Sequence, residues 1–209
     1  MTHTNDFSEI LSGRRSVRQF DEGVKIPQAE LLGMIQEAVS APSSINMQPW
    51  RFLVVTSDEA KEKLRPLIRF NTRQNDSSAA MILILGDLQC YECGEQIYNE
   101  AVAMGLMPEE VRDKQLATML PYYQNLSKEE MTRIVTIDAS LVAMQLMLVA
   151  RKHGYDTNPI GGFEAEGLPD ALDYNKERYV PVMILAIGKA KEAGFPSYRL
   201  PATEITRFE

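Results

Sequence analysis

An arginine-rich segment near the N-terminus carries the first group of side chains that could do chemistry. It reads Arg14-Arg15-Ser16-Val17-Arg18, and in an extended backbone alternate side chains point the same way. Arg14, Ser16 and Arg18 would then face one side together. Guanidinium groups offer paired donors that match phosphate oxygens, so the pattern indicates an anion site. A solvated basic turn is the alternative interpretation.

Neutral hydrogen-bonding groups crowd a second segment, which precedes a short apolar run. It reads Pro42-Ser43-Ser44-Ile45-Asn46-Met47-Gln48-Pro49-Trp50. The prolines restrict the backbone, while the hydroxyl and amide groups suit the edge of a heterocycle. The segment is therefore a candidate ligand loop, although ordinary polar loops share this composition.

A glycine pair and two later cations complete the set of candidates. The glycines lie in Asn158-Pro159-Ile160-Gly161-Gly162-Phe163, where a backbone without side chains could approach a flat ligand and present its N–H groups. A tight turn is the alternative. Beyond Gly188-Lys189 comes Tyr198-Arg199-Leu200-Pro201, and Arg199 could add positive charge to an anion site. The G-x-G-x-x-G dinucleotide motif is absent, so another device must hold any phosphate.

Four helices are predicted to position these segments. Asp6 is a suitable N-cap and Gly13 a stop for a short helix between them. Helical apolar spacing marks a second helix from Pro27 to Ser40, and Asp58 is expected to cap a charged helix that continues to about Arg69. The longest, Lys128 to His153, is apolar on nearly every face in its C-terminal half, so it should be enclosed by protein or by a partner subunit.

Short apolar runs predict three buried strands, which cover Phe52–Thr56, Met81–Leu85 and Val180–Ile187. Few strands between long helices predict a mixed sheet wrapped by helices. Residues 89–125 read as short helices and loops that could cover a pocket. Residues 195–209 read as an arm without core pattern, within a single domain spanning residues 1–209.

Composition excludes several classes of function. The net charge is −7 over 209 residues, which argues against nucleic-acid binding. The polar N-terminus predicts no secretory signal, and no run is apolar enough for an easy membrane span, so a cytoplasmic protein is expected. Cys90 and Cys93 form one C-x-x-C pair, read as ordinary thiols in a reducing compartment. His3 and His153 have no ligand spacing, so no metal site is predicted.

Taken in order, these segments closely resemble the FMN-dependent nitroreductase family over nearly the whole chain. Arg14 to Asp21 is similar to the family's phosphate-binding segment, Pro42 to Trp50 to its flavin loop, and Pro159 to Phe163 to its glycine turn. Arg199-Leu200-Pro201 is similar to its C-terminal arginine motif. The resemblance implies an α+β fold with a mixed, mainly antiparallel central sheet wrapped by helices. It also implies a homodimer, with the apolar helix at the interface and the C-terminal arm extending over the partner subunit.

The resemblance also implies roles for individual residues. Arg14, Ser16, Arg18 and Arg199 would hold the FMN phosphate and ribityl chain, and the loop residues would come from the partner. Asn71 would reach the pyrimidine edge, and the backbone N–H groups of Gly161 and Gly162 would lie near flavin N5. The full cofactor set is Arg14, Arg15, Ser16, Arg18, Pro42, Ser43, Ser44, Ile45, Asn46, Gln48, Asn71, Gln74, Pro159, Ile160, Gly161, Gly162, Lys189 and Arg199. Aromatic groups that could line a substrate pocket are Phe70, Tyr122, Tyr123 and Phe163, each of which could equally be a core residue.

Two positions depart from the family pattern. Many members have a lysine where this chain has Gln74, and a second basic residue where it has Ser197. A missing cation near flavin N1 and O2 should stabilise the reduced cofactor less.

The activity implied is transfer of electrons from NADH or NADPH to nitroaromatics, quinones or similar small acceptors by a ping-pong cycle, without a catalytic side chain. A flavin carrier or sensor without turnover is one alternative. A specialised flavoenzyme on the same scaffold, such as a dehydrogenase, a dehalogenase or a flavin-cleaving enzyme, is another.

Overall fold

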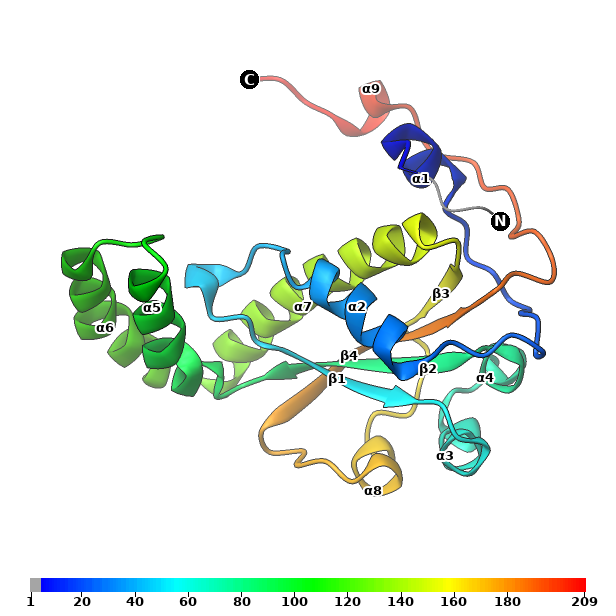
Figure 1. Cartoon of the computed structure of the whole chain (residues 1–209), viewed down its shortest axis with the longest axis horizontal. Helices are drawn as coiled ribbons and strands as arrows, with labels where there is room; N and C mark the ends of the chain where they lie inside the picture. The colour runs from blue at the N-terminus through cyan, green and yellow to red at the C-terminus, as the bar shows by residue number, and fades with distance from the viewer. Residues whose placement is uncertain (1–4) are drawn as a thin grey trace.

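A four-stranded antiparallel sheet forms the centre of the computed structural model, which describes residues 5–209 (Figure 1). Its strands are β1 (Trp50–Val55), β2 (Ala80–Asp87), β3 (Asp156–Ile160) and β4 (Tyr179–Gly188), in the order β1-β2-β4-β3. Every residue of β2 is buried, which explains its unbroken apolar run. An isolated parallel bridge joins Ser16 to Thr157 beside the β3 edge. The expected α+β class is confirmed.

Helices cover both faces of this sheet. On one face lie α2 (Gln28–Ala38) and α7 (Lys128–Lys152), whose apolar residues form one core with β2 and β4. On the other lie α3 (Asp58–Leu64), α4 (Thr72–Ser77) and α8 (Leu168–Leu172), where Leu64 and Leu168 are completely buried (Figure 1). Short 3-10 turns, Ser44–Asn46 and Arg65–Leu67, connect parts of these layers.

The helix α7 is long and apolar enough to cross a membrane by length and composition alone. It instead packs along the sheet, burying Val142, Ala143 and Leu146. A reciprocal capping box between Ser127 and Glu130 starts the helix, and Gly154, with φ 76°, ends it. It is therefore the central core helix of the fold.

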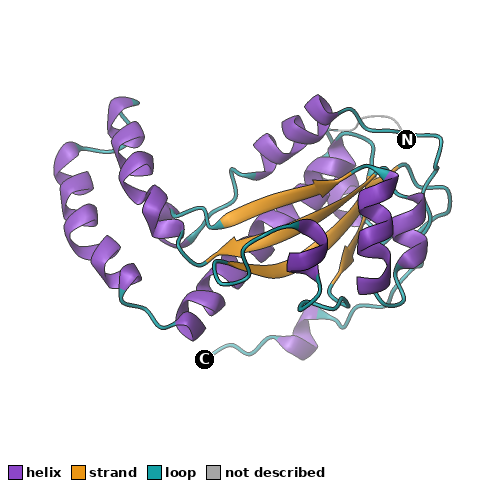
Figure 2. Ribbon diagram, turned by 90° about the horizontal axis from the view of Figure 1, so that it is seen from below, coloured by secondary structure: helices purple, strands orange, loops and turns teal. Residues whose placement is uncertain are grey.

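Two helices project from one end of the sheet as a hairpin (Figure 2). They are α5 (Gly94–Ala103) and α6 (Glu109–Gln124), preceded by a 3-10 turn at Cys90–Cys93. A third core beneath them contains Met47, Tyr98, Tyr123 and Val135. The prediction of only short helices and loops here was wrong for α6. That helix buries only Tyr123 fully, so its sequence carries little helical apolar spacing.

Among the remaining elements, the short helices α4, α8 and α9 were not predicted, and the charged helix expected to reach about Arg69 ends at Leu64. The helix α1 (Phe7–Gly13) begins after Asp6 as predicted, and α2 and the three predicted strands agree to within a few residues. Ser57, rather than Asp58, caps α3, because its hydroxyl accepts from the Ala60 amide at 3.2 Å. The strand β3 was not predicted, since its polar residues and Pro159 are tolerated only at a sheet edge.

The segment after β4 runs back along α1 as an exposed chain that ends in the short helix α9 (Ala202–Ile205) (Figure 1). Phe195, Tyr198 and Phe208 are 69%, 78% and 93% exposed. These exposures are compatible with the arm predicted for residues 195–209, which stays a prediction. Its extension over a partner subunit also remains a prediction.

Candidate functional site

The arginine-rich segment is fastened to the edge of the sheet through its backbone. The Val17 amide donates to the Thr157 carbonyl at 3.0 Å, and the Asn158 side chain donates to the Val17 carbonyl at 3.0 Å. Val17 itself is buried in the core. Because side chains alternate along an extended segment, burying Val17 turns Ser16 and Arg18 outward.

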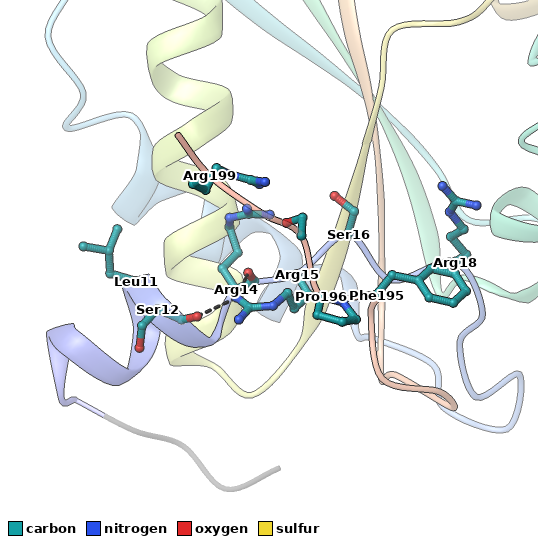
Figure 3. A pocket seen from close by; sticks show the side chains of 10 residues that line it. Leu11, Ser12, Arg14, Arg15, Ser16, Arg18, Phe195, Pro196 and Arg199 are labelled. Atoms are coloured by element: carbon teal, nitrogen blue, oxygen red, sulfur yellow. Dashed lines mark hydrogen bonds between the residues drawn. The ribbon is translucent and has the colours of Figure 1, made fainter. Parts of the chain in front are cut away.

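These outward side chains line a pocket of about 520 Å³ together with the start of the C-terminal arm (Figure 3). Its lining consists of two short stretches from opposite ends of the chain: Leu11, Ser12, Arg14, Arg15, Ser16, Arg18, Phe195, Pro196, Ser197 and Arg199. Gly194 allows this approach, since a Cβ there would lie 2.5 Å from Cβ of Arg15 and 3.1 Å from the Ser16 carbonyl oxygen. Two distant segments thus concentrate positive charge in an acidic chain.

The four arginines of this pocket are not equivalent. Arg15 donates to the carbonyls of Ser12 and Arg14 at 2.5 and 2.8 Å, so it closes the end of α1. Arg18 lies over the Phe195 ring, with 5.5 Å from its guanidinium carbon to the ring centroid. Within residues 5–209, no ion pair involves Arg14, Arg18 or Arg199. Their charge is available to an anion, and the donor set suits a phosphate group.

The glycine turn follows β3 and lies against Asn71. The Asn71 side chain donates to the carbonyls of Ile68 and Gly162 at 3.0 and 3.4 Å. A Cβ on Gly161 would meet nothing within 4 Å, so the backbone there is open to an approaching ligand. Pro159 and Ile160 belong to β3 itself, which joins this turn to the arginine pocket through the Ser16–Thr157 bridge.

Aromatic residues predicted to line a substrate pocket fall in different places. Phe70 is 97% exposed beside Asn71. Phe163 is half-buried and packs against the core on the sheet face covered by α3 and α8. Tyr122 is exposed at a separate surface pocket between α6 and α7. Tyr123 is a buried core residue, because its ring fills the core beneath the α5–α6 hairpin. The structure therefore gives it no access to a pocket in this chain.

The predicted flavin loop has an unusual backbone. Ile45, Asn46 and Gln48 have φ values of 45°, 58° and 46°, although none is glycine. Left-handed conformations of this kind cost on the order of 1–3 kcal/mol each and persist where the surroundings impose them. Strain of this kind clusters at ligand-binding sites, so the loop is a candidate binding element. It does not contribute to the arginine pocket of the same chain, because none of its residues lines that pocket.

The loop borders a second pocket of about 590 Å³ with the α5–α6 hairpin. Asn46, Met47 and Gln48 form one side, and Gln96, Ile97 and Met104 are among the residues opposite. Asp138 on α7 accepts a hydrogen bond from the Ser44 amide at 3.0 Å. Sequence reasoning missed Asp138, because a single acid within an apolar helix gives no signal of its partner.

One cofactor residue predicted from the sequence points elsewhere. The Lys189 ammonium donates to the Gly154 carbonyl and lies 4.6 Å from the centre of the Tyr155 ring. It does not line the arginine pocket. Its backbone still contributes, since the Lys189 carbonyl accepts from the Asp21 amide at 2.8 Å and so fastens the N-terminal segment.

Metal and thiol chemistry find little support in the described residues. Over residues 5–209, no group of three or more His, Cys, Asp or Glu side chains could hold a metal ion, and His3 lies outside that range. Burial raises the pKa of the Cys90 thiol to about 12, so it stays protonated. Cys93 is partly exposed, with its sulfur 3.6 Å from the Arg51 guanidinium.

Comparison with known proteins identifies the family. The model of the nitroreductase family matches residues 11–189, which include the arginine segment, the loop and the glycine turn. The chain belongs to the nitroreductase family. It is accordingly an oxidoreductase.

Relatives within the nitroreductase family match along their whole length. A Bacillus subtilis protein named as an NAD(P)H nitroreductase, YdgI, is 49% identical over 209 residues, covering 100% of both chains. The CLA biosynthesis enone reductase of Lactiplantibacillus plantarum is 42% identical, covering 98% of this chain and 94% of its own. A solved nitroreductase structure from Exiguobacterium sibiricum, in complex with FMN, is 50% identical with a TM-score of 0.96, covering 100% of this chain and 99% of that chain.

Proposed function

We propose that this protein is an FMN-dependent oxidoreductase that takes electrons from NADH or NADPH and passes them to small electron-poor acceptors. One observation carries the proposal: Arg14, Ser16, Arg18 and Arg199 line a single pocket. The family membership and the FMN complex of a 50% identical relative support the choice of ligand. Nitroaromatics, quinones and similar molecules are the proposed acceptors.

The residues present fit both the phosphate group and the flat ring of an FMN molecule. Arg14, Arg18 and Arg199 would hold the phosphate, since none of them pairs with a carboxylate among residues 5–209 and each can donate to phosphate oxygens. The open backbone at Gly161 would let the flat ring approach, and Asn71 fixes that turn from behind. FMN, when bound, supplies the electron transfer, and the protein supplies binding and orientation.

The donor and the acceptor would use the same open face in turn, which is a ping-pong cycle. No side-chain nucleophile is required in such a cycle. The exposed Phe70 and the half-buried Phe163 flank the glycine turn region and would offer apolar surface to both molecules.

A homodimer would complete this site. Ile137, Leu141 and Met144 are 53%, 43% and 38% exposed on the outer face of α7 at helical spacing, which gives an apolar stripe suited to a subunit interface. Asn46 and Gln48 belong to the second pocket, and no residue of their loop lines the arginine pocket, so we propose that they serve the partner's site. The exposed arm would extend over the partner, and the dimer would work in the cytoplasm, where both thiols stay reduced.

Absorption spectroscopy of the purified protein, followed by anaerobic titration with NADH and with NADPH, tests this function. We expect a yellow protein that either nicotinamide bleaches and that a nitroaromatic or a quinone re-oxidises. FMN added to flavin-free protein should raise its melting temperature, because a ligand at 100 times its Kd stabilises by about 2.7 kcal/mol. Colourless protein with an unchanged melting temperature would contradict the proposal.

The 42% identical enone reductase favours one second candidate, which is reduction of a carbon–carbon double bond beside a carbonyl group. Product analysis separates the two functions. Saturated ketone formed from an enone at a rate well above nitroaromatic or quinone reduction would favour the second candidate. A yellow protein that neither nicotinamide reduces would instead indicate a flavin carrier or sensor.

A further inference from the structure

The loop that carries Asn46 and Gln48 is held in its left-handed conformation from outside. The Tyr98 hydroxyl on α5 donates to the Ile45 carbonyl at 2.8 Å. On α7, Asp138 Oδ2 accepts from the Ser44 amide at 3.0 Å. Both contacts fall next to or at Ile45, whose φ is 45°. A β-branched residue rarely adopts this left-handed conformation by itself.

Asp138 is the charged member of this set of contacts. It is 3% exposed, and its carboxylate accepts a hydrogen bond from the Ser44 amide at 3.0 Å. The Ser44 amide therefore connects the loop to α7, as the Tyr98 hydroxyl connects it to α5.

No cation compensates this carboxylate, since no ion pair within residues 5–209 includes Asp138. The titratable groups that face it from neighbouring elements are Tyr123 on α6 and Cys90 in the turn before α5. Burial raises the pKa of both, so both are neutral near pH 7. A lone buried carboxylate is costly for a fold, which calls for a role other than stability.

We propose that Asp138 is a positioning residue, whose carboxylate holds the loop Ser43–Gln48 in the strained form that presents Asn46 and Gln48 to a flavin. The inference rests on the proposed function, because the ligand of the loop is assigned there. It adds a residue outside the ligand contacts that sets how well the loop binds.

Protonation of Asp138 should weaken this hold, because a neutral carboxyl group accepts hydrogen bonds less strongly than a carboxylate. Burial raises the pKa of Asp138 above its ordinary value of 3.8, and the bonds from Ser44 oppose that rise. A raised carboxyl pKa in the folded state means that stability falls as pH rises through that pKa. The charged form of Asp138 therefore holds the loop Ser43–Gln48 more strongly, while it lowers the stability of the folded protein.

Three variants test the assignment: Asp138→Ala, Asp138→Asn and, as a matched control, Asp170→Ala at an exposed aspartate on α8. Flavin-free protein is titrated with FMN, and the melting temperature is measured on the same samples. We expect Asp138→Ala to raise the Kd for FMN at least tenfold. Asp138→Asn keeps an acceptor oxygen and should raise it about threefold or less, with an unchanged or higher melting temperature. The control should leave both quantities unchanged.

Opposite changes in affinity and stability distinguish positioning from a purely structural role, which would lower both together. The pH dependence adds a second readout: as pH falls, the Kd of the wild type should rise relative to that of Asp138→Asn. Titration of the FMN phosphate affects both proteins equally and cancels in the ratio. A Kd of Asp138→Ala within twofold of the wild type overturns the inference.

Amide hydrogen exchange in peptides covering Ser43–Gln48 separates this inference from the proposed function, because it needs no FMN. Faster exchange in Asp138→Ala supports the anchoring of the loop, even if the wild type were found not to bind FMN. Unchanged exchange in that variant would show that Asp138 does not hold the loop.

Discussion

The side-chain amide of Gln74 donates a hydrogen bond to Oδ1 of Asn71 at 3.1 Å, while Asn71 donates to the Gly162 carbonyl at 3.4 Å. A neutral side chain thus fixes the asparagine that supports the glycine turn. Gln74 is buried, and it stands at the position where the family resemblance implies a lysine. At this position the chain has a hydrogen bond within the protein and no positive charge.

Gln74→Lys should make the bound flavin easier to reduce. An added cation near the pyrimidine edge stabilises the negative charge of the reduced cofactor. We expect the two-electron midpoint potential to rise on the order of 30 mV, equivalent to about 1.4 kcal/mol. Spectroelectrochemical titration measures it, and Gln74→Glu should lower the potential. Equal potentials in all three proteins would place Gln74 away from the flavin.

Arg14→Ala and Arg199→Ala should each weaken FMN binding, because each removes charge-assisted hydrogen bonds to the phosphate. At about 1.5–3 kcal/mol per bond, the Kd should rise roughly 10- to 100-fold. Isothermal titration of flavin-free protein measures the change. Arg207→Ala, which removes an exposed arginine paired with Glu209, is the matched control and should have no effect. Unchanged affinity in both pocket variants would refute the phosphate assignment.

Gly194→Ala should disturb the same pocket without touching a charge. The new methyl group would lie 2.5 Å from Cβ of Arg15, so the arm must move away from the N-terminal segment. We expect a loss of about 1–3 kcal/mol in unfolding free energy, together with weaker FMN binding. Urea unfolding and FMN titration check both effects.

Gly33→Ala is the control for that experiment. A Cβ on Gly33 would meet nothing within 4 Å, and the residue lies inside α2. The substitution should leave FMN binding unchanged and stabilise the protein by roughly 0.5–1 kcal/mol, because alanine favours a helix over glycine. If Gly194→Ala behaved in the same way, close packing of the arm at Arg15 would be disproved.

Leu141→Glu should break the proposed dimer, because it places a charge within the apolar stripe on α7. Leu141 is 43% exposed in the single chain, so the change leaves the monomer core intact. Analytical ultracentrifugation should show a shift toward monomer, accompanied by loss of bound FMN. Leu32→Glu, at a 57% exposed leucine on α2, should not change the oligomeric state. A dimer that survives Leu141→Glu would place the interface elsewhere.

Strong local patterns made most of the fold predictable. The buried β2 carries an unbroken apolar run and the long α7 buries apolar groups at helical spacing, and both patterns are visible in the sequence. The strand β3 and the helix α6 escaped prediction because their positions depend on tertiary contacts. Pro159 is acceptable only because β3 lies at the sheet edge, and α6 packs mainly through its pairing with α5.

The candidate site was predictable where residue type alone signals chemistry. Arginines and paired glycines are such signals. The residues that hold the site were not predictable, since Asp138, Tyr98 and Gly194 act through partners far along the chain. Only the folded structure brings Asp138 to Ser44, or Gly194 to Arg15.

The two-ended construction of the arginine pocket has a consequence for how the protein can be inactivated. Lys191 and its neighbours form an exposed connection between the sheet and Arg199. A single protease cut there would leave every strand paired while separating Arg199 from Arg14. The protein would stay folded yet lose one of the arginines proposed to hold FMN, so one cut in a surface segment would weaken the proposed flavin binding before the rest of the molecule is degraded.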